Sequence, residues 1–222
     1  MITTVAFDAD DTLVDIVAGV NAGLAAVVAA VGEPSLSVAG FRADADDCWL
    51  RMADQPATLI RETALRITLD RVGRGDETPR LLDLFFEVRF ANSRPFPGVL
   101  DVLAKLRSEY QLGYGTNANS EAARCGLGGL FAFELYALRG GVPKKPAAGF
   151  FEALLAAAGA RPGEVVYVGD SYDHDVVGAA GAGLRTVWLN RTGAPVPGPV
   201  RPDAIVADLA RLPAVIADLK AA

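Results

Sequence analysis

Two aspartates near the start of the chain have a spacing suited to metal or acid–base chemistry. Asp8 and Asp10 lie two residues apart, directly after the apolar run Ile2–Phe7. That run is short and rich in β-branched residues, which predicts a buried strand. Side chains at positions i and i+2 of an extended chain point to the same side. Two carboxylates aimed at one place call for a cation between them, and Mg²⁺ prefers oxygen ligands.

The other polar candidates also follow predicted strands. Thr116 and Asn117 end the apolar run 111–115, and Asp170 ends the run 164–169. Further strands are predicted at 131–138, 185–189 and 204–206, and helices at 99–110, 147–158, 173–182 and 209–219, with Pro146 at the first helical position. Alternating helices and apolar strands predict an α/β fold, a Rossmann-like three-layer core with a mostly parallel sheet. Ligands of such sheets bind at the carboxyl ends of the strands.

The region between Thr12 and Phe90 has no strand pattern. Its periodicity predicts four helices, at 17–31, 37–53, 57–72 and 78–90, and a stiff Pro/Gly connection follows at 94–98. We therefore expect a core domain formed by residues 1–13 and 95–222 and an inserted helical bundle domain at 14–94. Arginines of the insertion could bind an anionic group, but we expect most of them to form exposed salt bridges. These arginines are Arg51, Arg61, Arg66 and Arg89.

The bulk composition limits the function classes. The 222 residues are 51% hydrophobic and carry a formal net charge of -6, with no basic run, which argues against nucleic-acid binding. Cys48 and Cys125 are too few and too far apart for a disulfide framework. We see no charged leader and no apolar run that could span a bilayer, so we expect a cytoplasmic protein without a membrane partner. A monomer and a homodimer are both compatible with the sequence.

Four short motifs occur in order at the predicted strand ends. Asp8-Ala9-Asp10-Asp11-Thr12 resembles the first motif of the haloacid dehalogenase (HAD) superfamily, whose phosphatases carry Asp-x-Asp-x-Thr. Thr116-Asn117, Lys145-Pro146 and Gly169-Asp170-Ser171, the last with Asp175, resemble the second, third and fourth motifs. The resemblance covers the core and not the insertion. It implies that residues 14–94 form a helical cap of the C1 type.

The resemblance also implies a role for each matching residue. Asp8 would be the nucleophile that forms an aspartyl-phosphate, and Asp10 the general acid and base. Asp8, Asp170 and the backbone carbonyl of Asp10 would hold Mg²⁺. The phosphoryl oxygens would be bound by the Thr116 hydroxyl, the Asn117 N–H and the Lys145 ammonium. Thr12 would fix the turn after the strand, while Asp175, in the first turn of a helix, would orient either a metal-bound water or the lysine.

The implied function is hydrolysis of a small phosphorylated metabolite by a Mg²⁺-dependent phosphatase. Three alternatives remain: a 2-haloacid dehalogenase, a phosphomutase, and a non-catalytic binding protein with this fold. A dehalogenase needs neither a metal nor an acid at Asp10, so the sequence favours phosphoryl chemistry. Other polar residues near the motifs have simpler interpretations. Asp11 is expected in a turn, Lys144 in a solvated loop, Ser120 as the cap of a short helix, and His174 on the surface at a helix start.

Overall fold

The chain divides into two compact units. The computed structural model describes residues 1–221. One unit, the core unit, consists of residues 1–14 and of the chain from Pro95 onward, and the other, the helical unit, is Asp15–Arg94. Each unit has its own buried cluster of hydrophobic side chains, and each is described separately below.

The core unit contains a six-stranded sheet in the order β3-β2-β1-β4-β5-β6, and every neighbouring pair is parallel. The strands are β1 Thr4–Phe7, β2 Gln111–Thr116, β3 Phe133–Tyr136, β4 Val165–Gly169, β5 Arg185–Leu189 and β6 Ala204–Val206. β1 and β4 are buried along their whole length, which explains why their sequences are nearly continuous apolar runs. The predicted α/β fold is confirmed.

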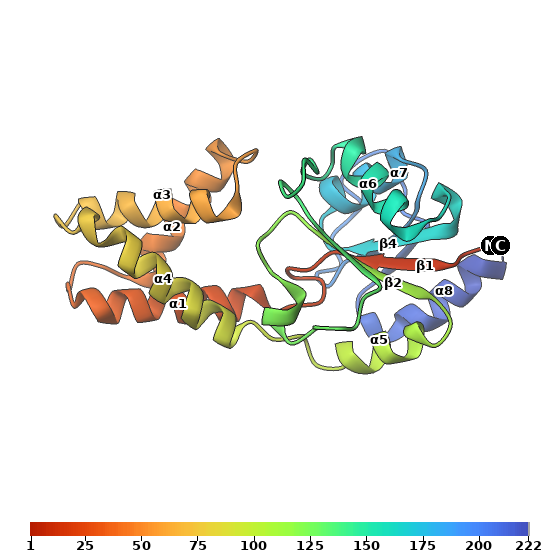
Figure 1. Cartoon of the computed structure of the whole chain (residues 1–222), viewed down its shortest axis with the longest axis horizontal. Helices are drawn as coiled ribbons and strands as arrows, with labels where there is room; N and C mark the ends of the chain where they lie inside the picture. The colour runs from red at the N-terminus through yellow and green to blue at the C-terminus, as the bar shows by residue number, and fades with distance from the viewer. Residues whose placement is uncertain (222) are drawn as a thin grey trace. The chain divides into compact units, whose positions relative to one another are not determined.

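Helices cover both faces of this sheet. They are α5 Val99–Arg107, α6 Ala148–Ala158, α7 Gly178–Gly181 and α8 Leu212–Ala221. Figure 1 shows α5 and α8 on one side of the strands and α6 and α7 on the other. Phe150, Phe151 and Leu154 of α6 pack with Tyr167 of β4 in one buried cluster. The result is a three-layer core.

One prediction around the third motif was wrong. Pro146 does not begin a helix, because α6 starts only at Ala148. The backbone N–H and C=O of the preceding Lys145 both bond to the Asn117 side chain, which holds this segment outside the helix. The helix predicted at 173–182 is present, and it consists of a π-helix, Tyr172–Val177, followed by the short α7.

Ser120 does not cap a helix. The following turn is a 3-10 helix, Ala122–Cys125, preceded by Glu121, and the Ser120 hydroxyl donates to the Asp10 carboxylate. The remaining 3-10 turns of the core unit are Pro162–Glu164 and Leu209–Arg211.

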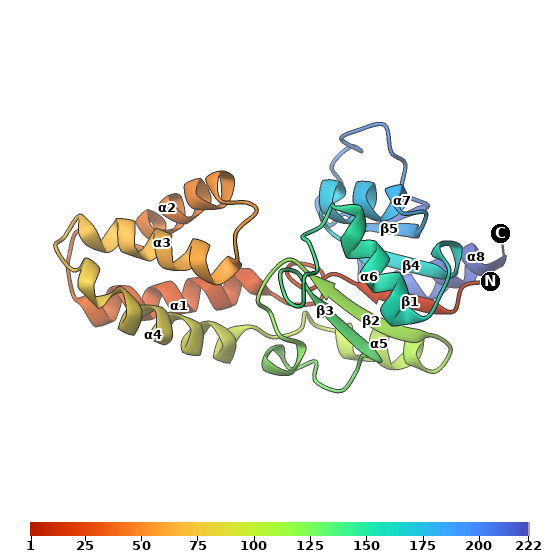
Figure 2. The ribbon, with the colours of Figure 1, turned by 45° about the horizontal axis from the view of Figure 1, so that its top comes forward.

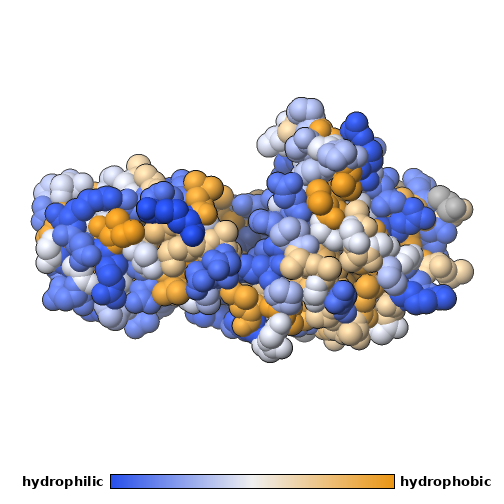
Figure 3. Space-filling view, turned by 90° about the horizontal axis from the view of Figure 1, so that it is seen from above, coloured by the Kyte–Doolittle hydropathy of each residue, from blue (hydrophilic) through white to orange (hydrophobic). Residues whose placement is uncertain are grey.

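The helical unit is a bundle of α1 Ile16–Val31, α2 Val38–Arg51, α3 Ala57–Asp70 and α4 Thr78–Asn92, with a 3-10 turn at Gly75–Glu77 (Figure 2). Asp15 caps the first helix, and Gly32 ends it in the left-handed conformation (φ 67°). Side chains from all four helices form its core, among them Leu24, Phe41, Leu65 and Phe85. The face of this bundle visible in Figure 3 is largely hydrophilic.

The sheet order places a natural site in the core unit. β1 lies between β2 and β4, and the strand order runs outward from it in both directions. A crevice forms at such a reversal, outside the carboxyl ends of the strands. The residues that follow β1, β2 and β4 therefore meet at one edge. Among the helices of residues 1–221, none is long and apolar enough to cross a membrane.

Candidate active site

A cavity of about 180 Å³ lies at this edge of the core unit. Its wall consists mostly of polar residues that follow β1, β2 and β4. Lys145, from the segment between β3 and α6, and residues of the π-helix Tyr172–Val177 complete it. The lining residues are Asp8, Asp10, Thr116, Asn117, Ala118, Lys145, Asp170, Ser171, His174 and Asp175. Of the residues predicted to form the site, only Thr12 does not line the cavity. It contacts one of the lining carboxylates instead.

Lys145 is the central cation of the cavity and is only 4% exposed. Its ammonium donates to Asp8 Oδ1 at 2.6 Å, to Asp175 Oδ1 at 2.7 Å and to the Tyr167 hydroxyl at 2.9 Å. Burial acts to lower the pKa of Lys145, but Asp175 and Asp8 outweigh it and raise the pKa well above its ordinary value. The lysine is therefore charged at neutral pH and is held by three oxygens.

The backbone and side chain of Lys145 are both fixed by residues of the sheet. The side-chain amide of Asn117 donates to Lys145 O at 2.9 Å and accepts from Lys145 N at 2.7 Å. Tyr167, in the middle of β4, donates its hydroxyl to Gly115 O at 2.7 Å, so its oxygen faces the ammonium in one orientation. The side chain of Asn117 thus positions the lysine, a role that sequence analysis did not foresee.

Three carboxylates of the cavity lie close enough to share a cation. One oxygen from each of Asp8, Asp170 and Asp175 lies within 4.8 Å of the others. Burial, Asp8 and Asp175 raise the pKa of Asp170 to about 7. Burial likewise raises the pKa of Asp175 to about 6, although Lys145 opposes this shift. The converging negative charges are only partly balanced by Lys145, and an oxygen-rich, negatively charged site of this kind fits a hard divalent cation.

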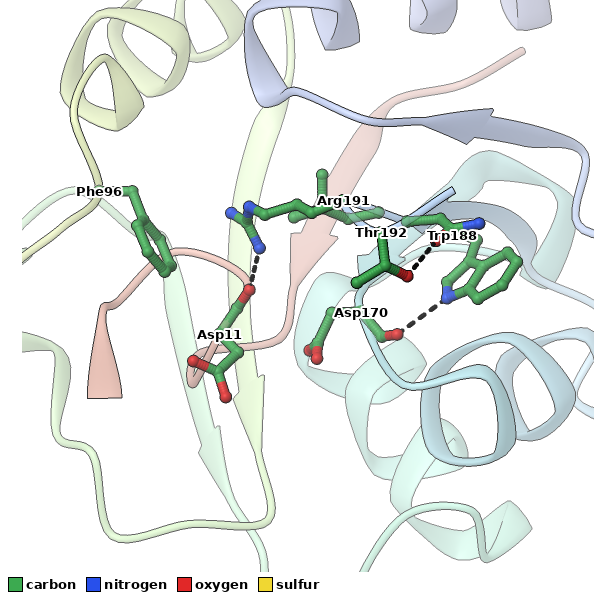
Figure 4. A pocket seen from close by; sticks show the side chains of 8 residues that line it. Asp11, Phe96, Asp170, Trp188, Arg191 and Thr192 are labelled. Atoms are coloured by element: carbon green, nitrogen blue, oxygen red, sulfur yellow. Dashed lines mark hydrogen bonds between the residues drawn. The ribbon is translucent and has the colours of Figure 1, made fainter. Parts of the chain in front are cut away.

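The backbone N–H, the backbone carbonyl and the carboxylate of Asp170 all form hydrogen bonds. The Thr12 hydroxyl donates to Asp170 Oδ1 at 2.9 Å and accepts from Asp170 N at 3.1 Å. The indole N–H of Trp188, on β5, donates to Asp170 O at 2.8 Å (Figure 4). Thr12 therefore fixes the position of Asp170 rather than only the turn after β1.

Arg191, in the loop after β5, binds the turn that contains Thr12. Its guanidinium donates to the backbone carbonyls of Asp11 and Thr12 and lies 4.3 Å from the centre of the Phe96 ring. Figure 4 shows Arg191 reaching across to the Asp11 carbonyl, beside a second cavity of about 290 Å³ that Asp170 also lines. Asp11 has φ 55°, so its turn adopts the left-handed conformation, where non-glycine residues are uncommon. Arg191 binds the carbonyl of this residue and of the next.

Asp10 and Thr116 also line the first cavity. The Ser120 hydroxyl donates to Asp10 Oδ1, which fixes one oxygen of that carboxylate. The buried Thr116 hydroxyl accepts from Ala118 N at 3.0 Å. His174 is an exposed residue, but part of it contributes to the cavity wall. Partial burial of its imidazole and the charge of Lys145 lower its pKa. At neutral pH its imidazole is neutral.

Sequence analysis missed four residues that support the site: Tyr167, Ser120, Trp188 and Arg191. Only Tyr167 carried a usable signal, because it is the one side chain with a polar group within the otherwise apolar run 165–169. A buried tyrosine hydroxyl needs a hydrogen-bond partner. The other three lie in turns or strands whose sequence does not indicate which neighbour they contact.

A protein-family model matches most of the chain. The model of a family described as haloacid dehalogenase-like hydrolase matches residues 2–183. Among curated relatives, a glyceraldehyde 3-phosphate phosphatase of Methanothermobacter thermautotrophicus is 27% identical over 86% of each chain. A phosphoserine phosphatase of Thermus thermophilus is 33% identical over 68% of this chain and 62% of its own length.

Solved structures share the fold over nearly the whole chain. A 2-haloacid dehalogenase of Pseudomonas syringae matches with a TM-score of 0.80 and 30% identity, covering 98% of this chain and 99% of its own. YfnB, a HAD-hydrolase of Bacillus subtilis solved with magnesium bound, matches with a TM-score of 0.82 and 20% identity, covering 97% and 98%. At that identity the second match supports the fold alone.

Proposed function

The chain belongs to the haloacid dehalogenase-like hydrolases, and we propose that it is a Mg²⁺-dependent phosphatase acting on a small phosphomonoester. The observation that carries the proposal is the convergence of Asp8, Asp10 and Asp170 with Lys145 on one cavity. The phosphatase names of the curated relatives support the same reaction class.

The charge of the cavity is the physical argument for a metal. Four carboxylates and a single lysine line it, and the neutral His174 adds no positive charge. An anionic phosphate ester would be repelled unless a cation joined the site. Asp8 and Asp170, with the backbone carbonyl of Asp10, would hold Mg²⁺. When bound, the ion would supply the positive charge that offsets this repulsion.

In the first half of the reaction Asp8 acts as the nucleophile. One of its oxygens is already bound by the Lys145 ammonium, and an oxygen of this carboxylate attacks phosphorus. The bond from phosphorus to the ester oxygen breaks while Asp10 gives that oxygen a proton. The products of this step are the free alcohol and a phosphoryl group carried by Asp8. Thr116 and the N–H of Asn117 would donate to the phosphoryl oxygens, as Lys145 would.

In the second half a water molecule removes the phosphoryl group from Asp8. Asp10, now a carboxylate, takes a proton from this water as it attacks phosphorus. The bond between phosphorus and the Asp8 oxygen breaks, and inorganic phosphate leaves with Asp8 restored. The hydroxyl of Ser120 donates to one oxygen of Asp10 and so fixes the position of this carboxylate.

A dehalogenase is the second candidate, because a 2-haloacid dehalogenase is 30% identical over almost the whole chain. That reaction begins with the same attack by an aspartate, but on carbon, and it releases a halide that needs no proton. Asp10 would then have no role, and the excess of carboxylates would have no balancing cation. A phosphomutase would also use Asp8 but would return the phosphoryl group to substrate rather than to water.

One assay separates these reactions. We expect the full chain to release inorganic phosphate from p-nitrophenyl phosphate with Mg²⁺ and to stop when EDTA is added. Within a panel of phosphorylated metabolites, some should turn over faster. Release of halide from 2-chloropropionate in EDTA, without any release of phosphate from the panel, would establish the dehalogenase instead.

The helical unit is the proposed source of substrate selection. Its separation as a compact unit supports the proposal that residues 14–94 form a cap domain. Its sequence lies outside the four motifs, so a choice between phosphorylated metabolites would be made by its side chains. The proposed partner of the enzyme is thus a small phosphorylated metabolite.

A further inference from the structure

The four arginines of the helical unit that the sequence singled out fall into two pairs. Arg51 and Arg66 are exposed and form salt bridges one helical turn along their own helices, with Asp47 and Glu62. This is the arrangement that the sequence predicted. Arg61 and Arg89 are instead 8% and 3% exposed, so these two do not lie on the exposed surface that was expected for most of the four. Long cationic side chains are almost never buried to this extent unless they are paired.

Arg61 lies on α3, and its guanidinium is held mainly by an aromatic ring. The guanidinium carbon lies 4.8 Å from the centre of the Phe85 ring. Within residues 1–221 no carboxylate forms a salt bridge with Arg61 and no side-chain hydrogen bond of Arg61 occurs. A ring face attracts a cation, but it does not accept the five N–H bonds that a guanidinium offers.

Two further guanidinium groups lie near enough to affect Arg61. Arg89, on α4, stacks 4.4 Å from the centre of the Phe90 ring, and Arg42, on α2, donates to the Asn21 amide oxygen at 2.7 Å. Burial, Arg89 and Arg42 lower the pKa of Arg61 to about 10, and Asp46 opposes this only in part. Three helices thus bring three positive charges into one region of the bundle.

A charge in this setting lowers the stability of the protein unless a partner balances it. The described residues do not supply that partner for Arg61. Guanidinium groups bind carboxylates and phosphates through paired hydrogen bonds, which suits a small oxyanion. We propose that Arg61, with Arg42 and Arg89, forms an anion-binding site within the helical unit for the carboxylate or phosphate group of a small molecule.

Thermal unfolding of the metal-free full chain in rising concentrations of inorganic phosphate tests this site. The comparison is between wild type, Arg61→Met and Arg66→Met, the last being the matched control on the same helix. Phosphate binding at the cavity of the core unit contributes equally to all three and cancels in the differences. We expect wild type and Arg66→Met to gain the same increase in Tm, and Arg61→Met to gain clearly less.

Equal phosphate-induced increases in Tm for wild type and Arg61→Met would overturn the proposal, whatever the starting Tm of the variant. Should Arg61→Met fail to fold, Arg42→Met carries the same comparison, because Arg42 is only half-buried. Its phosphate-induced increase should also be smaller than that of wild type, and an unchanged increase would again overturn the site.

The anionic group could belong to the substrate or to a separate molecule, and kinetics distinguish the two. The first source rests on the proposed phosphatase function. It predicts that Arg61→Met lowers the ratio of kcat/KM for O-phosphoserine, which carries a carboxylate, to that for p-nitrophenyl phosphate at least tenfold. An unchanged ratio assigns the site to a separate anion. If wild type hydrolyses neither ester, the proposed function fails, while the phosphate-dependent Tm still decides the anion site.

Discussion

Two cations are buried to a similar extent in the two units, and their surroundings differ in kind. Lys145 of the core unit donates to two carboxylates and a tyrosine hydroxyl, whereas Arg61 of the helical unit has an aromatic ring and two other arginines as neighbours. The pKa of Lys145 is raised well above its ordinary value, and that of Arg61 is lowered to about 10. Burial acts in the same direction on both, so the neighbouring charges decide the difference.

This contrast distinguishes a preorganised group from one that lacks a partner. Lys145 is held in place before any substrate arrives, as a catalytic cation must be if it is to act without rearrangement. The cost of burying Arg61 is only partly offset by the Phe85 ring and Asp46, which is tolerable if a ligand offsets the rest.

Replacing Lys145, whose charge is balanced by carboxylates, should have the largest effect on stability and on activity. Lys145→Met would leave Asp8 and Asp175 buried without their partner, at a cost of about 3–5 kcal/mol in the free energy of unfolding. Loss of one preorganised donor should also lower kcat/KM by about 30- to 900-fold. Urea unfolding and phosphatase assays measure the two effects, with the exposed Lys105→Met as control. A variant as active as the control would show that Lys145 does not reach the phosphoryl group.

Removing a carboxylate of the same cavity should weaken metal binding. Asp170→Asn deletes a proposed ligand, so the affinity for Mg²⁺ measured by calorimetry should fall by about 100-fold or more, the upper range for loss of supporting groups. Asp173→Asn, an exposed neighbour in the next turn, should bind Mg²⁺ as wild type does. If both variants bound Mg²⁺ equally well, Asp170 would not be a ligand.

The raised pKa of Asp170 predicts how metal binding depends on pH. In the metal-free protein this carboxyl has a pKa of about 7, above its unfolded value, so it holds a proton below pH 7. Mg²⁺ must displace that proton, and its apparent affinity should fall about tenfold between pH 8 and pH 6. The same proton stabilises the metal-free fold at low pH, and this contribution is lost as pH rises through about 7. A constant affinity over this range would contradict the assignment.

Replacing Arg61 should have the smallest effect on stability, and it should stabilise the protein rather than destabilise it. In buffer without phosphate, Arg61→Met replaces the guanidinium over the Phe85 ring by an apolar side chain and deletes a buried charge that no carboxylate pairs within the described residues. We therefore expect a Tm a few degrees above that of wild type, equivalent to about 1 kcal/mol. Differential scanning calorimetry of the metal-free proteins measures it. A Tm well below wild type would mean that the bundle itself balances Arg61, and the contrast with Lys145 would disappear.

The sequence predicted the parallel sheet and the meeting of Asp8, Thr116 and Asp170 at one edge of it, because each of these residues directly follows an apolar run. Strand ends are local features, and the order of the strands follows from general rules for α/β folds. Which residue a side chain contacts in the folded protein is not a local property of the sequence. That the Asn117 side chain holds Lys145, or that Arg61 faces Phe85 rather than solvent, depends on contacts between distant segments.

The helix starts that were wrong have the same cause. Pro146 satisfied a local rule for the first position of a helix, but the tertiary bonds of Lys145 to Asn117 place the start of α6 two residues later. Ser120 satisfied a local rule for caps, but its hydroxyl is used by Asp10. In both cases a hydrogen bond to a residue that lines the candidate site took precedence over the local preference.

The most direct test of the account concerns Asp8, which is proposed to carry the phosphoryl group. The full chain would be mixed with Mg²⁺ and a ³²P-labelled phosphomonoester, quenched in acid within the first turnover and mapped by peptide. We predict label on the peptide that contains Asp8, and neither label nor turnover in Asp8→Asn. Label on a different residue, or turnover by Asp8→Asn at the wild-type rate, would contradict the account.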